Sequence, residues 1–210
     1  MPSPNGRFVS IEGIEGSGKS TLRAGLTSRL RARGKQVLET REPGGTVLGE
    51  RVRALFLDPS ARVDSRAEAL LLNAARAQLV RDEIVPALAA GSWVVSDRFA
   101  DSTLAYQGYG RGLDREALRG LAAFATAGLE PGLVLLVDVS PELSRARVRG
   151  RPGAEDRVER EDDAFHARVR QGYLELARHD ARIRIVDGAL APEDLLDIAW
   201  AHLEASVAEL

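Results

Sequence analysis

Short apolar segments alternate with longer segments of mixed polarity along the whole chain. The apolar segments predict five strands, which begin at Phe8 and cover 36–40, 93–97, 133–139 and 182–186. Between them, apolar residues recur at the helical period, as Leu22, Leu26 and Leu30 do. The predicted helices cover 18–33, 47–57, 66–90, 101–107, 114–127, 141–149, 162–180 and 192–207. Strands that alternate with helices in this way are typical of an α/β fold, in which helices cover both faces of a parallel sheet.

Proline and glycine mark where these helices should bend or end. Pro86 should bend or interrupt the helix over 66–90, because proline lacks a backbone N–H and its ring clashes with the preceding turn. Gly108-Tyr109-Gly110 should break the short helix that precedes it. Asp114 is expected to cap the next helix, and the charged stretch 150–161 is expected to be a loop.

Length, charge and composition indicate an ordinary globular protein. The 210 residues can form one substantial core, so 1–210 is expected to be a single domain. With 29 basic and 31 acidic residues, the net charge of −2 gives no reason to expect a nucleic-acid partner. No apolar run reaches the roughly 18–20 residues of a membrane helix, the first seven residues are polar, and cysteine is absent. We therefore expect a cytoplasmic protein that binds neither membranes nor nucleic acid.

The segment after the first strand carries a complete phosphate-binding pattern. Gly13, Gly18, Lys19 and Ser20 match G-x-x-x-x-G-K-[ST]. The glycines let several backbone N–H groups point into one concavity, and the following helix adds its positive end there. Lys19 can reach the terminal phosphates, and the hydroxyl of Ser20 can ligate Mg²⁺. The residues predicted to bind a nucleoside triphosphate are Gly13, Ile14, Glu15, Gly16, Ser17, Gly18, Lys19 and Ser20.

Two other segments follow strands and should line one cleft with the phosphate loop, because ligands of parallel sheets bind at the carboxyl ends of strands. Asp97, at the end of a buried strand, is placed as a Mg²⁺-associated carboxylate, and Arg98 supplies a planar donor for a phosphate. Arg41, in the stretch 41–45, could hold a second phosphate. The alternatives are a surface Asp-Arg pair and a plain surface turn.

A basic stretch indicates a lid. Arg145, Arg147, Arg149 and Arg151 are followed by Pro-Gly-Ala, which favours a mobile segment over approximately 147–160. An arginine lid that closes over a triphosphate would stabilise charge and exclude water. Nearby glutamates nearly balance these arginines, so a solvated charged surface is the alternative.

Polar side chains after the third strand are candidates for reading a base. The hydroxyl groups of Ser102 and Thr103 and the amide of Gln107 could contact its polar edge, whereas Tyr106 could equally be core packing. Arg76 lies within an apolar helix, where it either reaches water or faces a cleft.

Taken in order, these segments resemble the bacterial thymidylate kinases, a family of P-loop nucleoside monophosphate kinases. The matching stretches are 11–21, 40–46, 74–78, 97–99, 102–108 and 156–159. The most selective are Arg41-Glu42-Pro43-Gly44-Gly45 and Ala105-Tyr106-Gln107-Gly108. The resemblance implies a three-layer P-loop kinase fold with an arginine-containing lid, and a homodimer. It also implies that ATP, with Mg²⁺, phosphorylates dTMP to dTDP for dTTP synthesis.

The resemblance further implies roles for the matching residues. Arg41 and Arg98 would hold the acceptor phosphate, with Arg53 as a helper. Asp97 would act with Mg²⁺ and in the transfer. The expected substrate-binding residues are Glu15, Arg41, Arg53, Leu72, Arg76, Arg98, Ser102, Thr103, Tyr106 and Gln107, with Glu15 and Tyr106 near the sugar and Arg76, Thr103 and Gln107 around the thymine edge. Gly16 stands where some members carry arginine, so the lid would supply the catalytic cation. The expected catalytic residues are Lys19, Asp97, Arg98, Arg149 and Arg151, and the expected metal ligands are Ser20 and Asp97.

One position departs from the family pattern. The family usually has an aromatic residue four positions before Arg76, where its ring stacks on thymine, and this chain has Leu72. Base stacking is worth about 1–3 kcal/mol per base in nucleic-acid sites, so a kinase for another nucleoside monophosphate stays an alternative. A nucleotide-switched binding protein is less favoured. The chain lacks Asn-Lys-x-Asp, and its third strand ends in Asp97-Arg98 rather than Asp-x-x-Gly.

Overall fold

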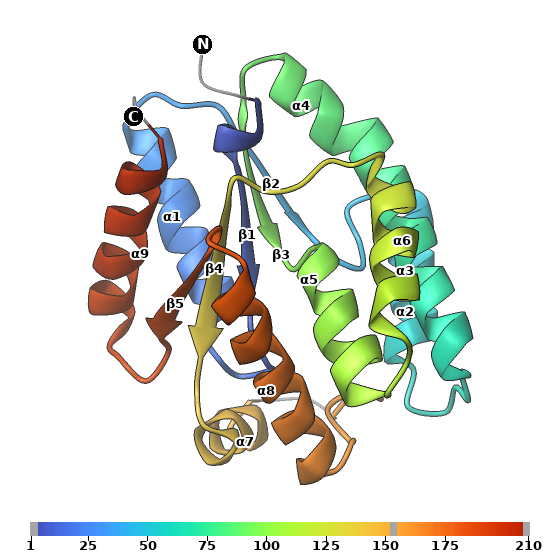
Figure 1. The fold of residues 1–210 in the computed structure, drawn as a ribbon. Helices are drawn as coiled ribbons and strands as arrows, with labels where there is room; N and C mark the ends of the chain where they lie inside the picture. Colours follow the sequence, from blue (N-terminus) through green and yellow to red (C-terminus); the bar gives the residue numbers. More distant parts are fainter. Residues whose placement is uncertain (1–3, 152–154, 208–210) are drawn as a thin grey trace.

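Five parallel strands form one sheet in the computed structural model, which describes residues 4–151 and 155–207 (Figure 1). The strands are β1 (Phe8–Glu12), β2 (Val37–Arg41), β3 (Trp93–Asp97), β4 (Leu133–Asp138) and β5 (Ile183–Asp187), in the order β2-β3-β1-β4-β5. Their ends lie within one residue of the predicted ones. The predicted α/β fold with a five-stranded parallel sheet is therefore confirmed.

Helices bury both faces of this sheet. Leu133 and Leu135 of β4 pack into the core beneath α1 (Lys19–Ala32) and α9 (Pro192–Ser206). Val134 and Leu136, which point the other way, pack with side chains of α8 (Asp163–His179). Figure 1 shows α1 and α9 on one side of the sheet and α5 (Ala100–Thr103) and α8 on the other. Burial on both faces explains why β1, β3 and β4 are nearly continuous apolar runs, whereas the edge strands β2 and β5 are partly exposed.

The remaining helices lie outside these layers or beside them. Three of them pack side by side, α2 (Val47–Leu57) against α3 (Ser65–Leu79) and α3 against α6 (Arg115–Thr126). The carboxylate of Asp114 accepts the backbone N–H groups of Glu116 and Ala117, at 2.8 and 3.0 Å, and so caps α6 as predicted. The short elements are a 3₁₀ turn, η1 (Pro4–Arg7), and the helices α5 (Ala100–Thr103) and α7 (Pro141–Arg149).

The predicted interruption near Pro86 is present. α3 runs into a wide π-helical turn, η2 (Val80–Ile84), before α4 (Val85–Ala89) begins. The backbone N–H of Val85 donates to the carbonyl of Val80, five residues earlier. Because Pro86 offers no N–H and its ring crowds the turn before it, the wider turn lets the helix continue past the proline.

The prediction that Gly108-Tyr109-Gly110 would break a helix was wrong. The chain continues from α5 as a π-helix, η3 (Leu104–Gly110). A Cβ on Gly110 would lie 2.7 Å from the Phe165 ring, and one on Gly172 would lie 2.6 Å from Tyr109. These glycines therefore allow η3 and α8 to approach closely. This tertiary packing outweighs the helix-breaking propensity of glycine, which is worth about 1 kcal/mol.

The strand order positions the ligand site. β1 lies in the middle of the sheet, with β3 on one side and β4 on the other. The chain therefore changes direction across the sheet beside the carboxyl end of β1, which is where open parallel sheets form a ligand crevice. Among the described residues, no helix combines the length and apolar character needed to cross a bilayer.

Candidate active site

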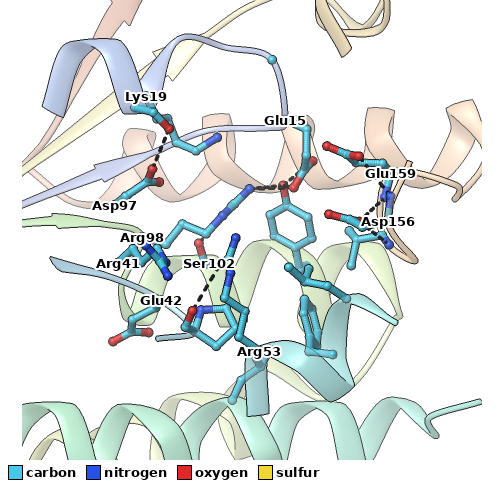
Figure 2. A pocket seen from close by; sticks show the side chains of 18 of the residues that line it. Glu15, Lys19, Arg41, Glu42, Arg53, Asp97, Arg98, Ser102, Asp156 and Glu159 are labelled. Carbon is cyan, nitrogen blue, oxygen red and sulfur yellow. Dashed lines mark hydrogen bonds and ion pairs between the residues drawn. The ribbon is translucent and has the colours of Figure 1, made fainter. Parts of the chain in front are cut away.

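The carboxyl ends of β1, β2 and β3 open onto one cavity of about 650 Å³. The phosphate loop, the segment 41–43 and the pair Asp97 and Arg98 all line it, as the topology predicted. Figure 2 shows Lys19, Asp97 and Arg98 gathered on one side of it. The predicted site residues in its lining are Glu15, Gly16, Gly18, Lys19, Ser20, Arg41, Arg53, Leu72, Arg76, Asp97, Arg98, Ser102, Thr103, Tyr106, Gln107 and Arg151. Four other predicted residues that the structure describes lie outside this lining: Gly13, Ile14, Ser17 and Arg149.

The phosphate loop packs tightly on the sheet. Gly13 has a φ of 137°, and a Cβ there would lie 2.4 Å from the carbonyl oxygen of Val137, so only glycine fits. Ile14 is buried in the apolar core below the loop. The side chain of Lys19 folds over the loop, and its Nζ donates to the carbonyl of Ile14 at 2.7 Å. Burial, together with the nearby charge of Arg98, lowers the pKa of Lys19 to about 8.

Ser20 and Asp97 bring two oxygen ligands together beside the loop. Ser20 Oγ donates to Asp97 Oδ2 at 3.1 Å, and Arg23 Nη1 lies 3.9 Å from the same oxygen. Mg²⁺ usually takes one or two protein oxygens and completes its octahedron with phosphate oxygens and water. In residues 4–151 and 155–207, three or more metal-binding acids, histidines or cysteines do not cluster anywhere. Ser20 and Asp97 therefore fit a magnesium ion that is shared with bound phosphates.

Arg98 has a left-handed backbone, with a φ of 74°. Its N–H donates to the carbonyl of Ile11 at 2.9 Å, and its own carbonyl accepts from Ser96 Oγ at 2.7 Å. Such a conformation costs of order 1–3 kcal/mol in a non-glycine residue and persists only where the surroundings hold it. These contacts aim the side chain back over the phosphate loop rather than along the strand.

Four side chains hold the Arg98 guanidinium in the cavity. Nη2 donates to Glu15 Oε1 at 2.7 Å and to Tyr106 Oη at 2.9 Å, and Nη1 donates to Ser102 and Tyr173, both at 3.2 Å. Burial alone would lower the pKa of Arg98, but Tyr106 and Glu15 raise it well above its usual value. Burial likewise opposes ionisation of Glu15, and the charges of Arg98 and Lys19 outweigh it, so the pKa of Glu15 is lowered. The guanidinium is therefore a fixed positive charge.

Sequence reasoning missed the acid below this cluster. Glu12 is fully buried and accepts hydrogen bonds from the Phe99 N–H at 2.7 Å, Ser102 Oγ at 2.6 Å and Tyr173 Oη at 2.8 Å. Burial raises the pKa of Glu12. Its position, as the acid that ends the buried strand β1, was a usable signal. Tyr173 comes from the middle of α8, where its spacing from Phe165 and Val169 predicts burial but not this contact.

Arg41 and Arg53 face the far end of the cavity. Arg41 lies on the rim, where its Nη2 donates to Glu50 at 3.1 Å. Arg53 Nη1 donates to the carbonyl of Pro43 at 3.1 Å, and burial lowers the pKa of Arg53. Both guanidinium groups are therefore held near the segment 41–43, on the side of the cavity away from Lys19 (Figure 2).

Arg76 lines the cavity but is saturated by protein acceptors. Its side chain is 2% exposed and donates to Glu42 at 2.8 Å, to Asn73 Oδ1 at 2.9 Å, to Thr103 Oγ1 at 3.0 Å and to the Phe99 carbonyl at 2.9 Å. A ligand would have to displace one of these partners to bond Arg76. The direct effect of Arg76 on the cavity is therefore to hold the hydroxyl of Thr103 in place.

Leu72 and Tyr106, which were expected near the base and the sugar, both line the cavity, and the alternative interpretation of Tyr106 as a core residue also holds. Leu72 lines the cavity as a partly buried aliphatic side chain. The ring of Tyr106 packs edge-on against Phe165, while its hydroxyl donates to Glu15 at 2.8 Å. Tyr106 is thus both a core residue and a polar residue of the cavity.

The arginines of the predicted lid divide between two faces of α7. Arg147 and Arg151 line the main cavity, whereas Arg145 and Arg149 line a smaller one of about 170 Å³ beside α8. Residues four apart share a helix face, so only one of the two arginines predicted to be catalytic reaches the main cavity. Part of the predicted lid, 152–154, lies outside the described residues.

Arg147 was not among the predicted site residues. Its Nη1 donates to the carbonyls of Gly16 at 3.3 Å, Ser17 at 3.4 Å and Gly188 at 2.8 Å, which ties α7 to the phosphate loop. A Cβ on Gly16 would lie 2.6 Å from the carbonyl oxygen of Ser144. The loop is therefore packed too closely against α7 to carry a large side chain at this position.

Comparison with known proteins gives one result throughout. The family model described as thymidylate kinase matches residues 11–197. The thymidylate kinase of Carboxydothermus hydrogenoformans is 52% identical over 190 residues, which cover 90% of this chain and 93% of that protein. The thymidylate kinase of Deinococcus radiodurans is 50% identical over 206 residues, 97% of each chain. That of Desulfovibrio desulfuricans is 52% identical over 206 residues, which cover 94% and 95%.

Proposed function

Because the chain belongs to the thymidylate kinase family, we propose that its cavity holds ATP and dTMP end to end, with their phosphates meeting between Lys19 and Arg98. The protein is an ATP-dependent phosphotransferase that converts dTMP to dTDP. The observation that supports this placement is the convergence of phosphate loop, Asp97, Arg98 and Arg41 in one cavity. The product is the precursor from which dTTP is made.

The residues of the cavity would catalyse this transfer by position and charge. A phosphate oxygen of dTMP attacks the γ-phosphorus of ATP, a new P–O bond forms, and the bond to the β-phosphate oxygen breaks. The attacking group is already an anion, so no strong base is required, and positioning and charge neutralisation carry the catalysis. Lys19 would hold the ATP phosphates and Arg98 the acceptor phosphate, with Arg41, Arg53 and Arg151 on the remaining sides.

Ser20 and Asp97 would hold Mg²⁺ on the donor side, where their oxygens are 3.1 Å apart. A bound magnesium ion would neutralise charge on the β- and γ-phosphates. Glu15 and Tyr106 would face the sugar of dTMP. The Tyr106 hydroxyl donates a hydrogen bond to the Glu15 carboxylate, and the pair lies at the cavity wall between Arg98 and the lid. Leu72, Thr103 and Gln107 would surround the base.

A panel of acceptors tests the proposed function. With ATP and Mg²⁺, phosphate transfer should be fastest to dTMP among dTMP, dUMP, dCMP, dGMP and AMP, and ATP should be preferred to GTP. Because Leu72 replaces a stacking ring, selectivity has to come from the polar edge of the base. Faster transfer to another monophosphate would support the alternative acceptor, and nucleotide binding without transfer would support a nucleotide-switched protein.

Lys19 should give the reaction a basic limb in its pH profile. The pKa of Lys19 is lowered to about 8 in the free protein, and only the ammonium form attracts phosphates. The kcat/KM for ATP should therefore be full below this pH and fall as pH rises through it. Bound phosphates raise the pKa of the amine, so kcat should hold to higher pH. Steady-state kinetics from about pH 7 to 10 measure both curves, and a kcat/KM that stays flat across this range would contradict the assignment.

We also propose a homodimer that uses the outer faces of α2, α3 and α6. These neighbouring helices expose Leu55, Leu70 and Phe124, which are 46, 57 and 88% accessible, and such patches usually mark interfaces. A single-chain mass by light scattering at micromolar concentration would refute the dimer. The reaction consumes ATP, so we place the protein in the cytoplasm. The expected absence of a nucleic-acid partner stays a prediction.

A further inference from the structure

Glu68, on α3, is a buried acid for which the proposed mechanism has no use. Its side chain is 2% exposed, and its carboxylate accepts from Gln107 Nε2 at 2.6 Å, from Arg157 Nη2 at 2.7 Å and from Arg111 Nη2 at 3.4 Å. An unpaired carboxylate at such a depth would cost several kcal/mol. The guanidinium groups of Arg111 and Arg157 offset this cost, and the carboxylate lies directly behind Gln107, which lines the cavity.

This carboxylate determines which end of the Gln107 amide faces it. A carboxylate paired with two guanidinium groups is surrounded by donors and acts as an acceptor, so the Gln107 atom at 2.6 Å is the amide nitrogen. The carbonyl oxygen of Gln107, Oε1, therefore does not contact Glu68. It is buried and has no hydrogen-bond partner among the described residues, although Gln107 lines the cavity. A buried acceptor without a donor costs about 1–3 kcal/mol, and a ligand that brings an N–H relieves that cost.

Thr103, one helical turn before Gln107, has the complementary property. Its Oγ1 accepts from Arg76 Nη1 at 3.0 Å, which leaves the hydroxyl hydrogen available to donate. The wall therefore offers one acceptor and one donor on the same side of the helix. A base edge that carries a ring N–H beside a carbonyl group satisfies both.

We propose that Glu68 is a specificity-determining residue, which acts through Gln107 to select bases that carry a ring N–H next to a carbonyl. Thymine and uracil have this edge. Cytosine has an acceptor nitrogen in place of the N–H, so it would face Gln107 Oε1 lone pair to lone pair. The inference rests on the proposed function, because it assumes that the acceptor base lies against Gln107.

Substitution of Glu68 by glutamine tests the inference. The new amide can donate as well as accept, so the Gln107 amide is no longer held in one orientation. The ratio of kcat/KM for dTMP to that for dCMP should fall by about 10- to 100-fold, the equivalent of one unpaired polar group. The ratio of dTMP to dUMP should stay unchanged, because both bases present the same edge, and the KM for ATP should also stay unchanged.

A matched variant separates this role from a purely structural one. Arg111→Met removes the more distant partner of the same carboxylate, at 3.4 Å, and leaves the close contacts of Arg157 and Gln107 in place. It should leave the ratio of dTMP to dCMP at the wild-type value, even if turnover falls. A shift as large as that of Glu68→Gln, or an equal loss of discrimination against dUMP, would overturn the inference, because Glu68 would then act by general packing.

A second variant keeps the test decisive if Glu68→Gln does not fold. Gln107→Leu removes the acceptor and should lower the same ratio, and adding Glu68→Gln to it should lower the ratio no further. An unchanged ratio in Gln107→Leu would overturn the inference. If the wild-type protein does not phosphorylate dTMP, the proposed function itself fails. If the wild type is selective and the variants are equally selective, only the role of Glu68 fails.

Discussion

Arg98→Ala is expected to lower kcat for dTMP phosphorylation by about 10³-fold or more, the loss that follows removal of a fixed cation from a phosphoryl-transfer site. The guanidinium is the group that four side chains hold rigidly between Lys19 and the acceptor side. Affinity for ATP should change little, because the phosphate loop binds it, and loss of the neighbouring charge raises the pKa of Lys19 toward its ordinary value. Single-turnover kinetics and a titration with a fluorescent ATP analogue measure the two effects.

Two further variants control for the loss of a charge and for folding. Arg182→Ala removes a guanidinium that is also paired with acids, Glu130 and Asp180, but at the opposite edge of the sheet. It should keep near-normal turnover. Arg98→Lys keeps the charge and should still lose most of the activity, because the three donors on one ammonium nitrogen cannot replace the planar fork that reaches Glu15, Tyr106, Ser102 and Tyr173. Near-normal turnover in Arg98→Ala, with an unchanged circular dichroism spectrum, would falsify the role of this arginine.

Local patterns were sufficient to predict the sheet and the phosphate loop. β1, β3 and β4 are short apolar runs because helices bury both of their faces. The spacing of Gly13 and Gly18 reflects a loop whose backbone has a positive φ at both positions. The cleft followed from topology, since the ends of parallel strands share one edge of the sheet. These features depend on residues that are close together in the sequence, so local sequence patterns are sufficient to predict them.

Features that depend on distant contacts could not be predicted in the same way. Gly108-Tyr109-Gly110 was expected to break a helix after Gln107, but η3 continues through Gly110, whose missing Cβ makes room for Phe165, more than fifty residues away. Tyr173 reaches Arg98 across 75 residues; its spacing from Phe165 and Val169 predicts that it is buried but not that its hydroxyl contacts Arg98. The resemblance implied a catalytic role for Arg149, whereas the face of α7 that meets the cavity carries Arg147. The packing of one helix against another determines where such a helix continues and which side chains reach the cavity.

Asp97→Asn is expected to lower kcat by about 10²-fold and to raise the Mg²⁺ concentration for half-maximal activity by about 10- to 100-fold. The substitution keeps the size of the side chain and its contact with Ser20, which is 3.1 Å long, but removes the negative charge that would attract the metal. Arg23, 3.9 Å from the same oxygen, would then repel the ion without compensation. Initial rates across a magnesium titration, at saturating ATP and dTMP, measure both quantities.

The same substitution at the next strand provides the control. Asp138 ends β4 as Asp97 ends β3, but it pairs with Arg170 at 2.7 and 2.8 Å and lies outside the cavity lining. Asp138→Asn should lower the melting temperature slightly and leave the magnesium requirement at the wild-type value. If both variants shift the magnesium titration equally, the effect comes from the overall charge of the protein. If neither does, Asp97 is not a ligand of the metal, and the two-oxygen site with Ser20 has to be abandoned.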